Sequence, residues 1–418
     1  MTVTLTAEER VIAAGDDGAG MAMRIVAEAA RLMGAPGLIP IRSAHIDGAL
    51  YHGDSGTLFA ERLVQGGAKV AVRSTLNVGA LDLTGCAQVR LAEPNRTMAR
   101  RMMDAYRALG CETTWTCAPY QAGHRPEHGT DVAWGESNAV VFCNSVLGAR
   151  TNRYGDFLDI ACAIAGRAPD YGLHRAENRR ATVLFDVSAL PAAFMASEIA
   201  WPVLGSLYGR ETGSAIGVVA GVSGHPGEDA LKAFGAAAAS SGAVGLFHVA
   251  GVTPEAPDLD TALGSLEPDH VIRVTEAMAA DARARLSTAE KPDRIDAVAI
   301  GSPHLSADEL ARLEALLAGR RVTVPLYTCT GRHVLATLDD ARRAGLEAAG
   351  VKLVADTCVV VTPILPDQAG GVLMTNSGKF AHYAPGNTGY AVLYGSLAEC
   401  VESAVSGRPV AESLSSWT

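Results

Sequence analysis

Residues 296–331 decide the fold class, and they read DAVAIGSPHLSADELARLEALLAGRRVTVPLYTCTG. A short apolar run ends in a loop of Gly, Ser, Pro and His. A helix with acidic residues in its first turn follows, and a second apolar run ends at a cysteine. Strand, loop, helix and strand in this order form the unit of a parallel sheet, whose reactive groups lie at the carboxyl ends of the strands. The stretch therefore predicts doubly wound α/β structure.

The same order of elements recurs along the chain. Residues 214–256 again give strand, Gly/His/Pro loop, acid-capped helix and strand, and residues 350–364 give a third strand with Cys358 close behind it. Nearer the N-terminus, residues 37–51 and 66–82 are short apolar strands that run into polar loops. The sequence thus predicts an α/β protein with parallel-rich sheets.

The chain begins with two predicted helices. Thr6 is followed three positions later by Glu9, which is the spacing of a capping box at the start of a helix. A second helix is expected at about residues 17–34. Charged stretches near residues 180 and 290 suggest boundaries between about three packed α/β/α domains. The predicted domains are residues 1–180, 181–290 and 291–418.

The composition restricts the class of partner. With 35 Lys and Arg against 45 Asp and Glu, the formal net charge of −10 argues against a nucleic acid or an anionic membrane as partner. The first residues lack the basic and apolar segments of a secretory signal, and no apolar stretch reaches the roughly 20 residues that cross a bilayer. We therefore expect a cytoplasmic globular enzyme.

Eight cysteines in a reducing compartment are not expected to form disulfides. Five of them lie where a cysteine packs as a small apolar side chain: Cys86, Cys111, Cys143, Cys162 and Cys400. The other three lie beside polar or turn-forming residues, namely Cys117 in TCAPY, Cys329 in LYTCTG and Cys358 in ADTC. These three are the candidates for chemistry.

Two blocks of the sequence concentrate groups that can act on a substrate. Residues 114–153 include Cys117, a Gly/His/Pro loop, Glu136, Arg150 and Arg153, together with Trp115, Tyr120 and Trp134 in a chain that is only 5% aromatic. Residues 374–386, MTNSGKFAHYAPG, place Ser377 and Lys379 in a turn that can direct amides, a hydroxyl and a cation at an anion. The Gly-rich Walker spacing is absent, so binding of a nucleotide phosphate is not predicted.

These two blocks are part of a larger set of motifs that, taken together, resemble one protein family. The further motifs are SAHIDG at 43–48, TLN at 75–77, LFHVAGVTPEA at 246–256, IGSPH at 300–304 and ADTC at 355–358. Over residues 5–405 the combination resembles the catalytic region of the aconitase X family, a divergent branch of the aconitase superfamily. The resemblance implies an aconitase-like α/β fold without the swivel domain, and an iron–sulfur dehydratase that acts on a small hydroxy acid.

The resemblance also implies the metal ligands. On the matching positions the cluster cysteines are Cys117 and Cys358. Members similar to mevalonate 5-phosphate dehydratases have a third cysteine in IGCPH, and here that position is Ser302. Serine is a poorer iron ligand than thiolate, so loss of the third thiolate favours a smaller cluster or iron alone. The expected cofactor is an iron–sulfur cluster of two irons or larger, or iron. Cys329 and Glu136 are the alternatives for completing the site.

The residue types suit removal of water from a β-hydroxy acid. That reaction needs a base for the α proton, a Lewis acid on the departing hydroxyl, and cations for the carboxylate. By analogy with aconitase, Ser377 is expected as the base or its hydrogen-bonding partner, with Lys379 and Glu136 as further catalytic residues. The expected substrate-binding residues are Ser43, His45, Arg150, Asn152, Arg153 and His248.

Three functions are compatible with these motifs. Members with serine in the IGSPH motif are similar to cis-3-hydroxy-L-proline dehydratases, and the resemblance therefore implies that substrate. The alternatives are a mevalonate 5-phosphate dehydratase and a non-catalytic α/β binding module in which Cys117 and Cys358 are packing residues. A zinc hydrolase is not favoured, because an HExxH pair is absent.

One partner is expected. Aconitase-type enzymes close a mobile domain over the site, and this chain ends at Thr418 without room for it. The resemblance then implies a separate small subunit that supplies the swivel domain.

Overall fold

The computed structural model describes residues 3–84, 89–368 and 370–410, and Cys86 lies outside this part of the chain. The chain forms two compact units. Unit 1 comprises Met1–Leu81 and Leu91–Arg180, and unit 2 comprises Asp82–Arg90 and Ala181–Thr418. Each unit is described by itself, and the predicted domain boundary near residue 290 stays a prediction.

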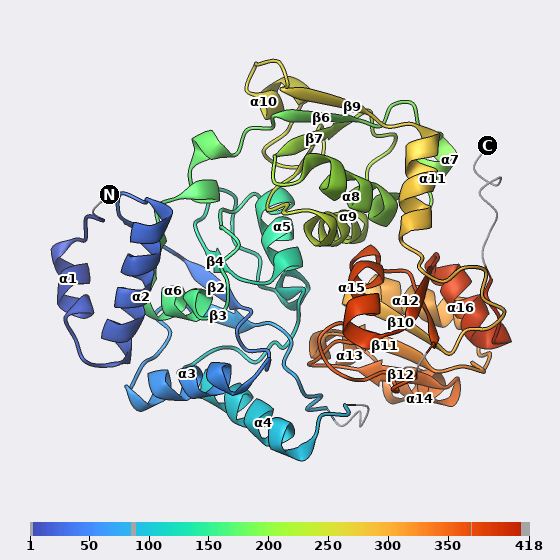
Figure 1. The fold of residues 1–418 in the computed structure, drawn as a ribbon, viewed down its shortest axis with the longest axis horizontal. Coiled ribbons are helices and arrows are strands. Elements are labelled where there is room, and N and C mark those ends of the chain that lie inside the picture. The colour runs from blue at the N-terminus through green and yellow to red at the C-terminus, as the bar shows by residue number, and fades with distance from the viewer. Residues whose placement is uncertain (1–2, 85–88, 369, 411–418) are drawn as a thin grey trace. The chain divides into compact units, whose positions relative to one another are not determined.

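The elements of unit 1 come first in the chain (Figure 1). Its α-helices are α1 (Ala7–Ala13), α2 (Gly18–Met33), α3 (Asp54–Gln65), α4 (Glu93–Ala108), α5 (Ser137–Ser145) and α6 (Leu158–Ala165). Its strands are β1 (Leu38–Pro40), β2 (Ser43–Ile46), β3 (Arg73–Leu76), β4 (Ala133–Trp134) and β5 (Arg167–Pro169), and its 3₁₀ helices are η1 (Pro119–Ala122), η2 (Gly172–His174) and η3 (Ala176–Asn178).

The first two helices begin where the sequence predicts. Thr6 and Glu9 form the complete capping box of α1, each side chain accepting a hydrogen bond from the other residue's backbone amide. Asp17 is the N-cap of α2, and its side chain accepts a hydrogen bond of 2.8 Å from the amide of Gly20. Both predicted helices are confirmed.

A three-stranded parallel sheet in the order β3–β2–β4 carries the SAHIDG motif of unit 1. The chain runs from β2 to β3 on one side of β2 and returns as β4 on the other, so the strand order reverses at β2. Ligands of open α/β sheets bind outside the carboxyl ends of the strands at such a switch point. Strands β1 and β5 pair separately as an antiparallel ribbon.

Unit 2 contains the recurrent strand–helix–strand segments. Its strands are β6 (Val183–Asp186), β7 (Gly217–Ala220), β8 (His248–Val249), β9 (His270–Arg273), β10 (Ala297–Leu305), β11 (Leu326–Thr330), β12 (Val351–Val354), β13 (Val372–Thr375) and β14 (Ala391–Tyr394). Its helices are α7 (Ala192–Met195), α8 (Ala200–Thr212), α9 (Glu228–Ser241), α10 (Leu259–Leu263), α11 (Glu276–Arg285), α12 (Ala307–Leu317), α13 (Arg332–Leu335), α14 (Asp340–Ala348), α15 (Gly378–Thr388) and α16 (Leu397–Ser406).

Two parallel sheets organise unit 2. One has the order β8–β7–β6–β9, and the other has the order β12–β11–β10–β13–β14. All strand pairs within both sheets are parallel. In the five-stranded sheet the order reverses between β10 and β13, which places the IGSPH and NSGK motifs at its switch point.

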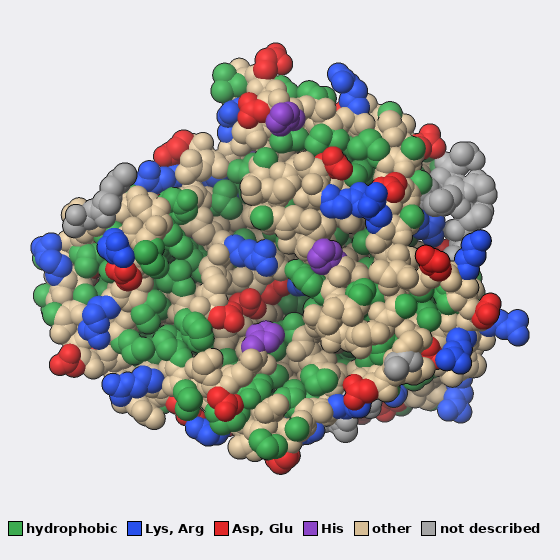
Figure 2. Space-filling view, in the orientation of Figure 1, with side chains coloured by type: hydrophobic (Ala, Val, Ile, Leu, Met, Phe, Trp, Pro, Cys, Tyr) green, Lys and Arg blue, Asp and Glu red, His purple; other side chains and the backbone are tan. Residues whose placement is uncertain are grey.

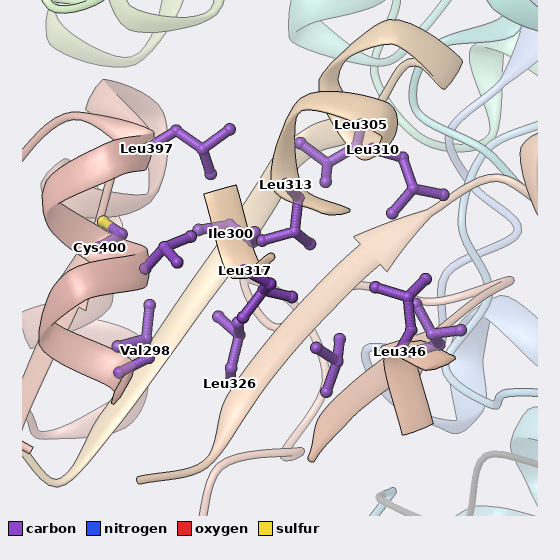
Figure 3. Packing of buried hydrophobic residues seen from close by; sticks show 14 of the residues in the cluster. Val298, Ile300, Leu305, Leu310, Leu313, Leu317, Leu326, Leu346, Leu397 and Cys400 are labelled. Carbon is purple, nitrogen blue, oxygen red and sulfur yellow. The ribbon is translucent and has the colours of Figure 1, made fainter. Parts of the chain in front are cut away.

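The core of the five-stranded sheet explains the apolar spacing of its helices. Leu310, Leu313 and Leu317 follow the helical period along α12 and are almost fully buried. They pack with strand residues such as Ile300, and Cys400 of α16 lies in the same apolar cluster (Figure 3). Cys143 and Cys162 are likewise buried in α5 and α6.

On the face drawn in Figure 2, basic and acidic side chains are interspersed, without a broad patch of one sign among the coloured residues. None of the helices formed by the described residues combines the length and the apolar character needed to cross a bilayer.

Candidate active site

The switch point of unit 2 brings Ser302 and Ser377 together. The hydroxyl of Ser377 donates a hydrogen bond to the backbone carbonyl of Ser302. Gly301 precedes Ser302 with a φ of +90°, and a Cβ at that position would collide with the carbonyl of Cys329. Only glycine permits this close approach of β10 to β11, so the backbone itself holds Ser302 beside Cys329.

Cys358 completes a constellation with these residues. Hydrogen bonds with the Cys329 thiol and the Ser302 hydroxyl, helped by the nearby charge of Lys379, lower the pKa of Cys358 to about 7 although burial opposes ionisation. All three side chains are at least 95% buried. A thiol with this pKa is about half thiolate near neutral pH, and thiolate is the form that binds metals. Among the described residues, no group of three or more His, Cys, Asp and Glu is arranged as a complete metal site.

The loop that presents Cys358 is held rigidly. Burial lowers the pKa of His304 to about 4, so its ring is neutral, and its Nε2 donates a hydrogen bond of 3.0 Å to the carbonyl of Thr357. Asp356 has a φ of +62°, a conformation that costs a non-glycine residue about 1–3 kcal/mol. Two hydrogen bonds of 2.7 Å from Arg332 fix its carboxylate. Strain of this kind collects at functional sites.

Ser377 and Lys379 form the start of helix α15. Ser377 is the N-cap and accepts a hydrogen bond from the amide of Phe380 at 2.9 Å. Lys379 lies in the first turn and is 9% exposed. A cation is unfavourable beside the positive end of the helix dipole. A role for Lys379 in holding an anion stays a prediction, and helix N-termini are in general suited to binding anions.

A pocket of about 570 Å³ lies within unit 2 over this helix start. Its lining includes Ser302, Ser377 and Lys379, together with His225 and Arg312. Its volume is sufficient for a small hydroxy acid.

A buried ion-pair network supports the wall of this pocket. Lys232 of α9 is 2% exposed and contacts the carboxylates of Asp229, at 2.8 Å, and Glu309. Burial disfavours its charge, but Glu309 and Asp229 together raise the pKa of Lys232 above the ordinary value. Lys232 also reaches the carbonyl of His304 at 3.5 Å, which links α9 to the IGSPH motif.

We expect Lys232→Met to lower the free energy of unfolding by about 3 kcal/mol, because it leaves two carboxylates without their buried partner. The loss is measured by urea unfolding of the full chain. Arg342→Met, which removes a partly exposed ion pair with Glu314 in the same unit, is the matched control and should cost under about 1 kcal/mol. Equal losses in the two variants would contradict this account of the network.

In unit 1 the switch point holds a buried chain of polar rings. His45 lies in register with Thr75 on β3 and with Trp134 on β4. The Thr75 hydroxyl lies 2.9 Å from Nδ1 of His45 and 2.7 Å from Nδ1 of His124. Both rings also pack against Trp134, with centroid distances of 5.5 and 5.0 Å. Four polar atoms of this cluster and its neighbour Asn77 are buried without a partner among the described residues: Nε2 of His45, Nε2 of His124, Nε1 of Trp134 and Oδ1 of Asn77.

Hydrogen bonds hold the loop after β2 in place. Asp159 accepts hydrogen bonds from the amides of Asp47, at 2.6 Å, and Gly48, at 3.1 Å. The side-chain amide of Asn77 donates to the carboxylate of Asp47. Burial raises the pKa of Asp159 to about 8, although the amides of Gly48 and Ile160 oppose this. The SAHIDG loop is therefore fixed at the carboxyl edge of the sheet.

Cys117 and Glu136 lie near this edge in the sequence block 114–153. Cys117 is 5% exposed and follows Trp115, whose φ of +44° repeats the strain found before Cys358. The carbonyl of Cys117 accepts a hydrogen bond of 3.1 Å from Asn138. Glu136 is the N-cap of α5 and accepts from the amide of Ala139 at 2.6 Å. A helix cap accounts for Glu136, so its catalytic role stays a prediction.

The remaining predicted substrate-binding residues are spread more widely. Ser43 is buried at the amino end of β2, and His248 is buried in β8 of unit 2. The amide of Asn152 is used within its own region, donating to the carbonyl of Tyr171 and accepting from the amide of Leu173. Arg150 and Arg153 differ in their exposure to solvent. Arg153 is exposed, whereas Arg150 is half-buried with its Nε unpartnered among the described residues.

The sequence interpretation missed several members of the site. Thr75 and Asn77 lie in the quoted TLN motif, and His124 lies in the Gly/His/Pro loop of residues 114–153, but none of the three received a role. The contact of Cys329 with Cys358 depends on strand order, which local sequence does not reveal. A polar residue within a buried strand is the signal that could have identified Thr75.

Comparison with known proteins decides the family. Models of the aconitase X first, second and third domains match residues 2–177, 181–284 and 295–406. The chain belongs to the aconitase X family. The predicted family and the predicted α/β fold class are confirmed. The chain is similar to a solved structure of aconitase X from Thermococcus kodakaraensis in its holo form, with 33% identity, a TM-score of 0.85, and coverage of 96% of this chain and 100% of that one.

Two curated aconitase X relatives carry names of enzymes. The chain is 44% identical to the cis-3-hydroxy-L-proline dehydratase of Pseudomonas aeruginosa, over 99% of this chain and 72% of that protein. It is 39% identical to the phosphomevalonate dehydratase large subunit of Methanothermobacter thermautotrophicus, over 89% of this chain and 91% of that protein. Both names are those of dehydratases, which are lyases.

Proposed function

We propose that this chain is the catalytic chain of an iron-dependent hydro-lyase that converts cis-3-hydroxy-L-proline into Δ1-pyrroline-2-carboxylate. The observation that supports this substrate is the 44% identity with a cis-3-hydroxy-L-proline dehydratase along 99% of the chain. Relatives named phosphomevalonate dehydratase large subunit have between 32% and 39% identity. A cytoplasmic location is part of the proposal.

The donor set of unit 2 fits a thiophilic metal. Cys358 is held as a partial thiolate by Cys329 and Ser302, and soft thiolates select iron–sulfur clusters over hard cations. We infer that Cys358 and Cys117 are ligands and that Cys329 or Ser302 completes the set, since Glu136 is engaged as a helix cap. When bound, an iron–sulfur cluster of two or more irons, or iron alone, supplies a Lewis acid for the departing hydroxyl.

The chain's own residues account for binding and proton transfer. Lys379 and the first-turn amides of α15 hold the carboxylate, with Arg150 and Arg153 as the other candidate cations. Ser377 takes the α proton, or orients the group that does. Loss of that proton and of the 3-hydroxyl, which departs as water, leaves an enamine. Transfer of the enamine proton to C3 then gives the cyclic imine. Ser43, His45, Asn152 and His248 remain proposed substrate contacts.

The proposal includes a small subunit that carries the swivel domain. Its support is the name "large subunit" of relatives such as the one from Methanothermobacter thermautotrophicus, of which this chain covers 91%. The same names support the alternative substrate, mevalonate 5-phosphate. A non-catalytic binding module is the remaining alternative.

The test is an anaerobic assay of the purified complex with each substrate in turn. We expect turnover of cis-3-hydroxy-L-proline, and a kcat/KM for the phosphate ester at least about 100-fold lower, because a pocket without the right partners for a charged group rejects it strongly. Turnover of the phosphate ester alone would reverse the substrate. Absence of turnover of both, with no iron in the protein, would favour the binding module.

A further inference from the structure

The hydrogen bonds of Thr75 restrict the protonation of two histidines, of which the proposed reaction uses only His45, as a substrate contact. The Thr75 hydroxyl has one proton, and its partners among the described residues are Nδ1 of His45 and Nδ1 of His124. Thr75 and His45 are completely buried, and His124 is 2% exposed. The Thr75 hydroxyl and the two histidine rings must therefore hydrogen-bond with one another, because a buried polar group without a hydrogen-bond partner lowers stability.

When both rings are neutral, the hydrogen bonds are all satisfied only if one, and not both, of the two Nδ1 atoms carries a proton. If both Nδ1 atoms carried protons, the Thr75 proton would have no acceptor. If neither did, the hydroxyl could serve only one of the two rings. The bonds are all made when one Nδ1–H donates to the hydroxyl and the hydroxyl donates to the other Nδ1. A neutral ring has one proton, so the two histidines must be opposite tautomers.

The surroundings favour neutral rings. Burial lowers the pKa of His45 well below its ordinary value and the pKa of His124 to about 4. The two opposite-tautomer arrangements differ in which Nε2 carries a proton, and both Nε2 atoms are buried without a partner among the described residues.

We propose that Thr75 is a positioning residue that fixes His45 and His124 as opposite neutral tautomers, one with its proton on Nδ1 and the other with its proton on Nε2. Of the two unpartnered Nε2 atoms, one is then an acceptor or base and the other carries a proton and is a donor. A ligand that reaches this pair meets one acceptor and one donor. Of the polar groups of a hydroxy acid, a carboxylate only accepts and an ammonium only donates, whereas a hydroxyl does both. The pair is therefore matched to a hydroxyl, and this role rests on the proposed dehydration.

Nitrogen-15 NMR of the full chain labelled at histidine tests the assignment, because the two neutral tautomers give distinct long-range proton–nitrogen correlations. His45→Gln and His124→Gln identify the two signals. We expect one ring in the Nδ1–H form and the other in the Nε2–H form at neutral pH. Two identical tautomers, or a charged ring, would overturn the proposal whatever the enzyme turns over.

Three variants separate positioning from simple support of the fold. Thr75→Val removes the bridge, and we expect at least one ring to change tautomer and kcat to fall about 100-fold or more. Thr75→Ser restores the hydroxyl and should restore both signals and most activity. Thr57→Val, which removes a buried hydroxyl bonded to the carbonyl of Met98 in the same unit, should change neither signal. Unchanged tautomers in Thr75→Val would refute the proposal.

The outcome is independent of the substrate assignment. If wild type shows the two tautomers but does not dehydrate cis-3-hydroxy-L-proline, the proposed function fails and the tautomer assignment stands. If wild type dehydrates cis-3-hydroxy-L-proline but both rings have the same tautomer, the tautomer proposal fails and the proposed function stands.

Discussion

Replacing Cys358 with serine should remove both iron and activity. The thiol is buried beside Cys329 and Ser302, and its partial ionisation depends on those contacts. A serine hydroxyl does not ionise near neutral pH and is a poor ligand for iron. Loss of residues that only support metal ligands costs about 10–100-fold in affinity or activity, so loss of a ligand should cost more than about 100-fold. Iron and acid-labile sulfide per chain and kcat on anaerobic protein measure the effect.

Cys400→Ala is the matched control for this change. Cys400 is also a fully buried cysteine of unit 2, but it packs among leucines in the core (Figure 3). Its loss should cost about 1 kcal/mol of stability and leave iron and kcat unchanged. Full iron content and normal turnover in Cys358→Ser would show that Cys358 is only a packing residue.

Two substitutions of Ser377 should distinguish its role as the N-cap of α15 from a role in catalysis. Ser377 caps α15, and alanine at an N-cap costs about 1 kcal/mol of stability, whereas asparagine caps as well as serine. We expect Ser377→Ala and Ser377→Asn to lower kcat alike, by about 100-fold to 10,000-fold, because both remove the hydroxyl that takes or orients the α proton. Only the alanine variant should lower the free energy of unfolding appreciably.

The control for Ser377 is a cap remote from the pocket. Thr275 caps α11 through the amide of Met278, and Thr275→Ala should lose similar stability without loss of kcat. Activity close to wild type in Ser377→Asn would show that Ser377 acts only as a cap.

The local elements of this fold could be predicted because their signals are local. The Thr6 and Glu9 capping box, the apolar period of α12 and the cysteine after β12 are each encoded within a few residues. They depend on hydrogen bonds and burial over one or two helical turns. Parallel sheets followed from the recurrence of strand, helix and strand.

The constellations of the site could not be predicted because they depend on strand order. Ser302 meets Ser377 only because β10 and β13 are neighbours, although 75 residues separate them in the chain. Likewise, the register of β2 and β3 sets His45 against Thr75. Sequence alone identified most of the polar residues involved, but it could not show that the hydroxyl of Thr75 joins two histidine rings.

The most direct test of the proposed function is to follow cis-3-hydroxy-L-proline by NMR in D₂O with the anaerobic, iron-loaded complex. Dehydration through an enamine predicts that the substrate signals disappear and that Δ1-pyrroline-2-carboxylate forms with solvent deuterium at C3. The same sample depleted of iron should form none. Unchanged substrate in the presence of iron, together with consumption of mevalonate 5-phosphate, would contradict the proposed function.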